Sequence, residues 1–528
     1  MPALLAVAVA AWWGVLSTGF VWDDQALVLR NTMTGDLSNL PHFFMMDLWD
    51  SAEVGEEVSG YYRPLMLVSL AVDRALWGLS PAGHHLHSLV WHLLAMAGGY
   101  RLLRPLLGWQ GATLAVALFG LHPIQSEAVV WVAARNDPMA AALGLWSLAL
   151  LNRADVGVAG RVGAAVLALL AGLSKESVVL LPLLLLLLDL VQARRPELRR
   201  HAPLLLGIFG TLALRVLAGV GGATWPEPIG WRLLAARSPE LMVLLGRLIV
   251  APWPLSTGYA LEWMDRIPAA QRWFGLGGLA ALGFIAWRGA RLRGRLAWMG
   301  PLWLSITLGP VLVPLADKGL FGERYLYLGM LGVGVAVSLA LRAPLHGGAL
   351  LLLPCLVLIQ LRLPDWKAER TLWQSAHAHF PSPYTSSGLA HTYRTAGEDE
   401  PALQLFVASL DDPLPDVTVC PQVVGTALHQ GRPALAAQLA SWAQSRGCSG
   451  PAFAGQAASA WAFTGQWSAA AEALRGVDGP PAGRLLVVAT ALELRAGRLD
   501  AAEAMAMETA EPEAVLSQAR RMVELGAR

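Results

Sequence analysis

Two adjacent carboxylates, Asp23 and Asp24, follow directly on a first apolar segment over residues 2–18. Charged groups at the edge of a bilayer are costly to place and tend to mark a functional site. Neighbouring residues on a helix or strand point in different directions, so we expect the two acids to do different work. One would act as a general base, and the other would bind a hydroxyl group, a divalent metal or an arginine. The position of Asp24, deeper in the loop, slightly favours it as the base.

Further polar clusters interrupt the apolar chain and supply cations as well as acids. The candidate substrate-binding residues are Arg63, His122, Glu127, Arg135, Lys175, Glu176, Glu323, Arg324 and Tyr325. The predicted phosphate ligands among them are Lys175, Arg135 and Arg324, with Arg215 as a weaker candidate. The competing interpretations are helix caps, interfacial anchors and ion pairs between neighbours such as Lys175 and Glu176.

These residue types together favour one reaction class. A carboxylate would take the proton of an acceptor hydroxyl as it attacks an anomeric carbon, and cations would stabilise a departing phosphate. Access to lipid makes a polyprenyl-phosphate sugar the predicted donor. Trp22 and Tyr62 would stack on the sugar or anchor the loop at the interface. Two acids do not make a metal site, so a divalent metal at Asp23 or Asp24 is compatible with the sequence, but no cofactor is required.

Composition places the chain in a membrane. Of 528 residues, 55% are hydrophobic and 15% are charged, which is too apolar for a soluble domain of this length. The formal net charge of +1 gives no indication of a nucleic-acid partner. The excess of arginine over lysine, with the bias to alanine, glycine and leucine, is typical of a GC-rich bacterial genome. The expected location is therefore the bacterial inner membrane.

Apolar stretches predict a polytopic all-α membrane domain over residues 1–363. At about 17 to 25 residues per span, we expect about eleven spans, at 2–18, 84–104, 111–122, 138–151, 160–173, 177–191, 202–218, 271–287, 296–313, 325–341 and 347–361. Segments 65–79 and 240–251 are expected to lie along the membrane surface as amphipathic helices. If either were a true span, every later loop would change sides.

The distribution of arginine predicts the orientation. Short loops carrying Arg101, Arg104, Arg194, Arg195 and Arg288 hold almost no acids, so the N-terminus is predicted to be cytoplasmic. The polar clusters then share one outer face with a first outer loop over 19–83, and the C-terminal region lies outside. The histidines at 84, 85, 87 and 92 are expected at the inner face, as packing between helices.

From residue 364 to 528 the chain becomes less apolar and repetitive. Glycines at 397, 431, 465 and 497 are spaced by 34, 34 and 32 residues, and alanine follows each of them after five positions. This period predicts tetratricopeptide-like helix pairs with a concave surface that would hold a partner, or a scaffold that caps the membrane domain. Cys420 and Cys448 have no metal or redox spacing, and spacing alone leaves open whether they pair.

Six short motifs occur in order, and together they are specific although each alone is weak. They are Val21-Trp22-Asp23-Asp24, Tyr62-Arg63-Pro64-Leu65, the segment from His85 to His92, the segment from Leu118 to Val129 with Arg135, Lys175-Glu176-Ser177, and the segment from Glu323 to Leu328. This series resembles the transmembrane and tetratricopeptide repeat-containing O-mannosyltransferases and their bacterial relatives, which have the C-type glycosyltransferase fold. The resemblance covers nearly the whole membrane domain, but is poor from about 220 to 270.

The resemblance implies a polyprenyl-phosphate-linked sugar donor, an active site in the first outer loop and, for the eukaryotic members, protein serine or threonine acceptors. Asp23 and Asp24 correspond to the acidic pair of the family, and His122, Glu127 and Arg135 to its second outer loop. The predicted function is transfer of a hexose, mannose being favoured, to a hydroxyl of an extracytoplasmic protein or glycan. The alternatives are a lipid-linked glycan ligase, a flippase or transporter of lipid-linked sugars, and an assembly scaffold based on the repeats.

Overall fold

A computed structural model describes residues 1–52, 60–153, 155–221, 228–341, 344–412, 417–474, 490–491, 493–495, 497–507 and 512–526. This part of the chain is almost entirely helical, which confirms the predicted all-α class. Its sheet is one short antiparallel pair, β1 (Tyr259–Ala260) with β2 (Leu320–Phe321), in which Tyr259 lies opposite Phe321. Residues 53–59 of the predicted first outer loop lie outside the described residues.

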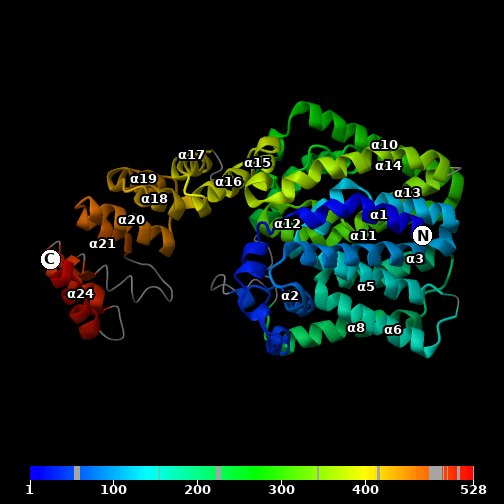
Figure 1. The fold of residues 1–528 in the computed structure, drawn as a ribbon, viewed down its shortest axis with the longest axis horizontal. Coiled ribbons are helices and arrows are strands. Elements are labelled where there is room, and N and C mark those ends of the chain that lie inside the picture. The colour runs from blue at the N-terminus through cyan, green and yellow to red at the C-terminus, as the bar shows by residue number, and fades with distance from the viewer. Residues whose placement is uncertain are drawn as a thin grey trace. The chain divides into compact units, whose positions relative to one another are not determined.

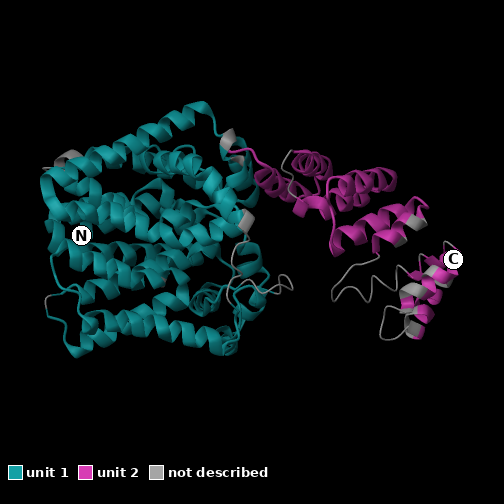
Figure 2. Ribbon diagram, turned by 180° about the vertical axis from the view of Figure 1, so that it is seen from behind, with its two compact units in different colours: residues 1–379 teal, residues 380–528 magenta. Residues whose placement is uncertain are grey.

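The chain divides into two compact units, Met1–His379 and Phe380–Arg528 (Figure 2). Composition alone placed the division at residue 363. The structure places it later because the segment after 363 packs within unit 1, where Trp366 and Trp373 are buried. The helix α15 (Glu369–His379) is therefore the last element of the membrane unit.

Unit 1 is a bundle of helices that pack along one another (Figure 1). In sequence, α3 packs on α5, α5 on α6, and α6 on α8, while α13 packs on α3 and α11. The helices of this unit are α1 (Pro2–Trp12), α2 (Pro64–Trp77), α3 (Pro81–Gly120), α4 (Ser126–Val130), α5 (Asn136–Leu151), α6 (Val158–Ser174), α7 (Leu181–Val191), α8 (Leu198–Leu217), α9 (Pro228–Val250), α10 (Ala269–Arg293), α11 (Met299–Leu308), α12 (Leu312–Lys318), α13 (Gly329–Ala340), α14 (Pro344–Arg362) and α15.

The long element α3 is a hairpin of two arms. Gly108 interrupts it with a left-handed backbone, at φ 69°. Nε2 of His92 lies 3.0 Å from the carbonyl oxygen of Gly120, although 28 residues of straight helix would separate them by about 42 Å. The arms correspond to the two predicted spans at 84–104 and 111–122. Glycine suits this reversal because it has no Cβ to oppose a positive φ.

The protein is a multi-pass membrane protein. Among the described residues, four helical stretches are long and apolar enough to cross a membrane, namely Pro81–Gly120, Leu198–Leu217, Ala269–Lys318 and Gly348–Lys367. Four shorter apolar helices lie at Pro2–Ser17, Val158–Ser174, Leu181–Val191 and Gly329–Ala340. Each of these falls on a predicted span, and the total of about eleven remains a prediction.

The two segments expected to lie along the membrane surface are both helical. The first forms α2, and the second forms the end of α9. Both ends of α9 contact residues on the predicted outer side: a Cβ at Gly230 would lie 2.1 Å from the carbonyl oxygen of Ala316, and His122 contacts the carbonyl oxygen of Ile249 at 3.1 Å. The placement of 240–251 along the membrane surface remains a prediction.

Unit 2 consists of helix pairs whose joints match the sequence period. Its helices are α16 (Pro383–Thr395), α17 (Asp399–Asp411), α18 (Cys420–His429), α19 (Pro433–Ser445), α20 (Pro451–Phe463), α21 (Trp467–Leu474), α23 (Leu499–Met507) and α24 (Pro512–Gly526). The four periodic glycines all have positive φ, between 68° and 79°, and the four alanines that follow them are fully buried. The predicted turns and packing positions are confirmed, whereas the tetratricopeptide class remains a prediction.

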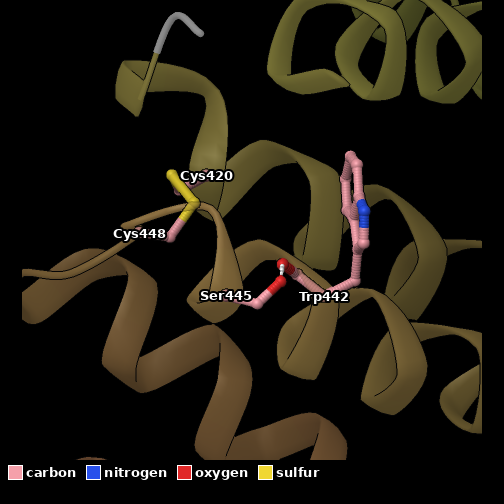
Figure 3. Close-up of a disulfide and its surroundings, with 4 residues drawn as sticks. All are labelled: Cys420, Trp442, Ser445 and Cys448. Carbon is pink, nitrogen blue, oxygen red and sulfur yellow. Dashed lines mark hydrogen bonds between the residues drawn. A yellow bond between two sulfur atoms is a disulfide. The ribbon is translucent and has the colours of Figure 1, made fainter. Parts of the chain in front are cut away.

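A disulfide joins Cys420 at the start of α18 to Cys448, which follows α19 (Figure 3). Their Cα atoms are 5.7 Å apart, within the usual range for a disulfide. The bond closes a loop around one helix pair and so fixes the start of its first helix to the end of its second. This settles the pairing that sequence spacing left open.

Candidate active site

Asp24 is buried and held by the backbone. The side chain is fully buried; its Oδ1 accepts from the N–H of Ala133 at 2.7 Å and its Oδ2 from the N–H of Val21 at 3.2 Å. Burial raises the pKa of Asp24 to about 8, although these hydrogen bonds act in the opposite direction. Asp24 therefore ties the first outer loop to the loop after α4.

Asp23 is the more accessible of the two acids. It is partly exposed, and its carboxylate has no hydrogen-bond partner recorded in the described part of the chain. Burial raises the pKa of Asp23 to about 6, while nearby Arg324 lowers it and Glu369 raises it. A carboxylate with this pKa and without a recorded partner is suited to accept a proton near neutral pH. The geometry thus favours Asp23 as the base, whereas the sequence slightly favoured Asp24.

The turn before Asp23 has an uncommon conformation. Trp22 has a positive φ of 55°, which residues with a Cβ rarely adopt and which persists only where the surroundings hold it. The Trp22 ring stacks on Trp131 with centroids 4.3 Å apart, and the edge of Trp373 contacts it at 5.5 Å. One ring face is therefore covered by protein. Tyr62 is buried, with its hydroxyl donating to the carbonyl oxygen of Phe44, so it anchors the loop rather than stacking on a ligand.

Arg324 lies beside this stack and is supported by Glu127. The buried Glu127 carboxylate accepts from both Nη1 and the backbone N–H of Arg324, and the guanidinium lies 5.0 Å from the Trp131 ring centroid. The Nε and Nη2 atoms of Arg324 have no partner recorded among the described residues, and its side chain is 20% exposed. The Arg324 guanidinium is thus fixed through Nη1, whereas Nε and Nη2 can donate to a ligand. Tyr325 contacts the same guanidinium at 4.9 Å.

The close approach of Arg324 to Glu127 depends on a glycine. A Cβ at Gly322 would lie 2.6 Å from Nη1 of Arg324 and 3.0 Å from Oε1 of Glu127. Gly322→Ala should displace the ion pair and lower transfer about 10- to 100-fold, because misplacement by an ångström in a site costs on this order. Gly277→Ala is the matched control, since nothing lies within 4 Å of a Cβ there. Equal rates for both variants would contradict the assigned role of this pair.

Lys175 lies within electrostatic reach of both Arg324 and Arg63. Nζ of Lys175 binds Oδ1 of Asp137 at 2.6 Å, and Nη2 of Arg63 binds Oε2 of Glu176 at 2.9 Å. Burial lowers the pKa of Lys175; Asp137 opposes this, and the charges of Arg63 and Arg324 lower it further. The structure therefore brings together three predicted cations, each with a carboxylate partner. The competing interpretation, an ion pair between the neighbours Lys175 and Glu176, does not hold, because each of them pairs with another residue.

Several predicted site residues instead hold the fold together. Arg135 is fully buried and binds Asp73, Ser69, Ser88 and the carbonyl oxygen of His84, so its guanidinium is not available to a phosphate. It joins the end of the second outer loop to α2 and α3, a structural role that the sequence does not distinguish from phosphate binding.

His122 and Glu323 are likewise buried in structural contacts. Both ring nitrogens of His122 contact the backbone, at Ile249 and Ile124. Oε1 of Glu323 accepts from the hydroxyl of Tyr259 at 2.8 Å and from the N–H of Ser256 at 2.9 Å. Arg215, the weaker phosphate candidate, donates to two backbone carbonyl oxygens, those of Gly60 and Gly221.

The histidines at the start of α3 lie at the other end of the bundle from the one predicted. Nε2 of His85 lies 3.3 Å from the carbonyl oxygen of Gly19, and the ring of Phe20 contacts His84 with centroids 5.1 Å apart. They pack beneath the first outer loop, so the inner-face prediction was wrong. Their position follows from the start of α3 at Pro81, directly after α2. The predicted packing role is correct, since His84 packs on Phe20 and His92 contacts the hydroxyl of Tyr327.

Sequence reasoning missed three residues of this site. Trp131 supports both Trp22 and Arg324, Asp137 binds Lys175, and Glu369 contacts the turn at Trp22. The partners of Asp137 and Glu369 lie far along the chain, so local spacing could not reveal them. Among the described residues, no group of three or more His, Cys, Asp or Glu side chains is arranged to hold a metal ion.

Unit 2 contains a groove of its own. It has a volume of about 530 Å³ and is formed mainly by the first helices of successive pairs, α16, α18 and α20. It is lined by Arg394, Thr395, Pro421, Gln422, Gly425, His429 and Gln456.

Comparison with known proteins supports the resemblance seen in the motifs. No family model matches the chain. It is 30% identical over 134 residues to Protein O-mannosyl-transferase TMTC3 of Mus musculus, a match that covers 25% of this chain and 15% of the relative. It is 35% identical over 124 residues to Protein O-mannosyl-transferase Tmtc2 of Drosophila melanogaster, covering 23% and 13% respectively. The predicted resemblance is confirmed, over a part that spans less than a fifth of either relative.

Two solved structures are similar to the chain as a whole. ArnT from Cupriavidus metallidurans in the apo state superposes with a TM-score of 0.39 and 17% identity, covering 89% of this chain and 78% of ArnT. The same protein bound to undecaprenyl phosphate gives a TM-score of 0.38 and 18% identity, covering 83% and 79%.

Proposed function

We propose that the protein is a membrane glycosyltransferase of the C-type fold. It moves a hexose, with mannose as the favoured sugar, from a polyprenyl phosphate to a hydroxyl group. The observation that carries this proposal is the position of Asp23, a partly exposed carboxylate without a hydrogen-bond partner recorded in the described residues, within electrostatic reach of the half-buried Arg324. A base beside a fixed cation suits a reaction in which a proton leaves one oxygen and negative charge develops on another.

Each residue of the site has a defined task in this reaction. Asp23 takes the proton of the acceptor hydroxyl, whose oxygen attacks the anomeric carbon and inverts it. The bond from that carbon to the phosphate oxygen breaks, and polyprenyl phosphate leaves. Arg324, together with Lys175 and Arg63, stabilises the charge on the phosphate. A monophosphate needs no metal for this.

The acceptor is proposed to be an extracytoplasmic protein or glycan held by unit 2. The groove along α16, α18 and α20 supports this, because a groove that runs over successive repeats suits an extended polypeptide. The disulfide between Cys420 and Cys448 supports placement of the unit in an oxidising compartment such as the bacterial periplasm. The N-terminus is then cytoplasmic, and the active site faces outward at the inner membrane.

The disulfide leads to a stability prediction. Replacing both cysteines, as Cys420→Ser with Cys448→Ser, should lower the free energy of unfolding of unit 2 by about 3 to 4 kcal/mol, because the closed loop spans 28 residues. Thermal unfolding of the full chain, followed by protease sensitivity of residues after 380, measures this change. A Cys355→Ser variant, which alters the buried free cysteine of unit 1, is the control. An unchanged unfolding temperature for unit 2 would mean that the bond contributes nothing.

The pKa of the base predicts the dependence of the rate on pH. Since burial raises the pKa of Asp23 to about 6 and the base must be ionised, the rate should rise with pH and reach half its plateau near pH 6. Below this value Asp23 is protonated and transfer is lost. The measurement is the initial rate at saturating donor between pH 4.5 and 8. A profile that is flat across this range would exclude Asp23 as the base.

The proposed function is tested with purified full-length protein in lipid nanodiscs. Polyprenyl-phosphate mannose, glucose and galactose are supplied in turn with serine- and threonine-containing peptides, with and without a chelator. We expect hexosyl-peptide from a monophosphate donor, at the same rate with the chelator. Transfer only from a diphosphate donor would favour the ligase alternative, and movement of donor between leaflets without transfer would favour the flippase.

A further inference from the structure

One carboxylate of the site comes from the far end of unit 1. Oε2 of Glu369 accepts from the backbone N–H of Trp22 at 3.0 Å, although 347 residues separate them. Oε1 of the same group accepts from Nε1 of Trp373 at 3.2 Å, and the Trp373 ring contacts the Trp22 ring. Both residues belong to α15, so this helix contacts the turn before Asp23 through a charge and an aromatic ring.

The residue that Glu369 holds is the one with the uncommon backbone. Trp22 has a φ of 55°, and a left-handed residue with a large side chain needs its surroundings to fix it. The stack on Trp131 fixes the ring, and the hydrogen bond to Glu369 fixes the peptide N–H. The next residue along the chain is Asp23. The direction of its side chain therefore follows from how the peptide at Trp22 is held.

We propose that Glu369 is a positioning residue for the base: it holds the turn at Trp22 so that the Asp23 carboxylate faces the acceptor hydroxyl, and it places a negative charge beside that carboxylate. This inference rests on the proposed function and assigns a role to a residue that neither the motifs nor the repeats include. Glu369 and Trp373, which contact Trp22, both lie on α15, the last helix before unit 2 begins at Phe380.

The charges facing Asp23 act in opposite directions. Arg324, from the turn at Glu323–Leu326, lowers the pKa of Asp23, whereas Glu369 raises it. Removing the charge of Glu369 would make Asp23 a weaker base that ionises at lower pH. A purely structural support would leave the pH dependence of the rate unchanged, so the two roles can be separated.

Two substitutions of Glu369 separate its hydrogen bond from its charge. Glu369→Gln keeps an oxygen for the N–H of Trp22 and gives up the acceptor of Trp373 Nε1, whereas Glu369→Ala removes both acceptors and the charge. We expect Glu369→Gln to stay within about threefold of the wild-type plateau, with the acidic limb of the pH profile moved to lower pH by half a unit or more. We expect Glu369→Ala to lower kcat about 10- to 100-fold with little change in KM for the donor, since positioning rather than binding is lost.

The outcomes distinguish this inference from the proposed function. Glu197→Gln, at an exposed acid next to α8, is the control and should match wild type in rate and pH profile. If Asp23→Asn is inactive but Glu369→Gln shows the wild-type pH profile, the inference fails and the proposed function stands. If Asp23→Asn is fully active, the proposed function itself fails. Should Glu369→Ala not fold, the pH profile of Glu369→Gln still decides.

Discussion

Asp23→Asn should lower the rate of sugar transfer at least about 100-fold while leaving the unfolding temperature unchanged. General base catalysis contributes about 10²- to 10⁴-fold, and asparagine cannot accept the proton. The fold should be unaffected, because the Asp23 carboxylate has no hydrogen-bond partner recorded in the described residues. The measurement pairs initial rates at pH 7.5 with thermal unfolding of the same preparation.

Asp24→Asn is the matched variant, and it should fail in a different way. Both Asp24 oxygens accept backbone N–H groups, from Val21 and Ala133. In asparagine, the NH2 group would face one of these two N–H groups, which would then lack an acceptor. A buried donor without an acceptor lowers the free energy of unfolding by about 1 to 3 kcal/mol. We therefore expect a lower unfolding temperature together with reduced activity. A stable, inactive Asp24→Asn beside an active Asp23→Asn would reverse the assignment of the two acids.

Arg324→Ala should lower kcat about 100- to 1000-fold, because removing one fixed donor to a developing negative charge costs on this order. Arg324→Lys should retain part of the activity, since lysine keeps the charge but not the planar fork. Initial rates at saturating donor, with the exposed Arg199→Ala as control, measure both changes.

A substitution of Glu127 gives a second test of the role of Arg324. Because Glu127 holds Arg324 through its backbone and its guanidinium, Glu127→Gln should also lower the rate, and its effect should not add to that of Arg324→Ala. Additive losses would mean that Glu127 acts on substrate by itself. Loss of activity in Glu127→Gln with full activity in Arg324→Ala would remove Arg324 from the phosphate site.

Local pattern was sufficient for features that depend on neighbours in sequence. The spacing of Gly397, Gly431, Gly465 and Gly497 gave the joints between helices, because a helix that ends in a left-handed turn needs a residue without a Cβ. The apolar stretches gave the helices of unit 1. Both features are fixed within one or two turns of chain, so no knowledge of distant contacts was needed.

The pairing of charges could not be read from the sequence. Glu127 with Arg324, Lys175 with Asp137, and Arg135 with Asp73 are joined across 197, 38 and 62 positions. Oppositely charged neighbours in sequence could have been taken as partners, but adjacent side chains on a helix point in different directions. The same limit hid Glu369, whose contact with Trp22 depends on how the last segment of unit 1 folds back over the first loop.

The most direct test of the account compares wild type with Asp23→Asn in nanodiscs supplied with polyprenyl-phosphate mannose and a serine- and threonine-containing peptide. Mass spectrometry of the peptide measures the hexose added per unit time. We expect hexosyl-peptide from wild type and at least about a 100-fold loss in Asp23→Asn at an unchanged unfolding temperature. Equal product from the two proteins would contradict it.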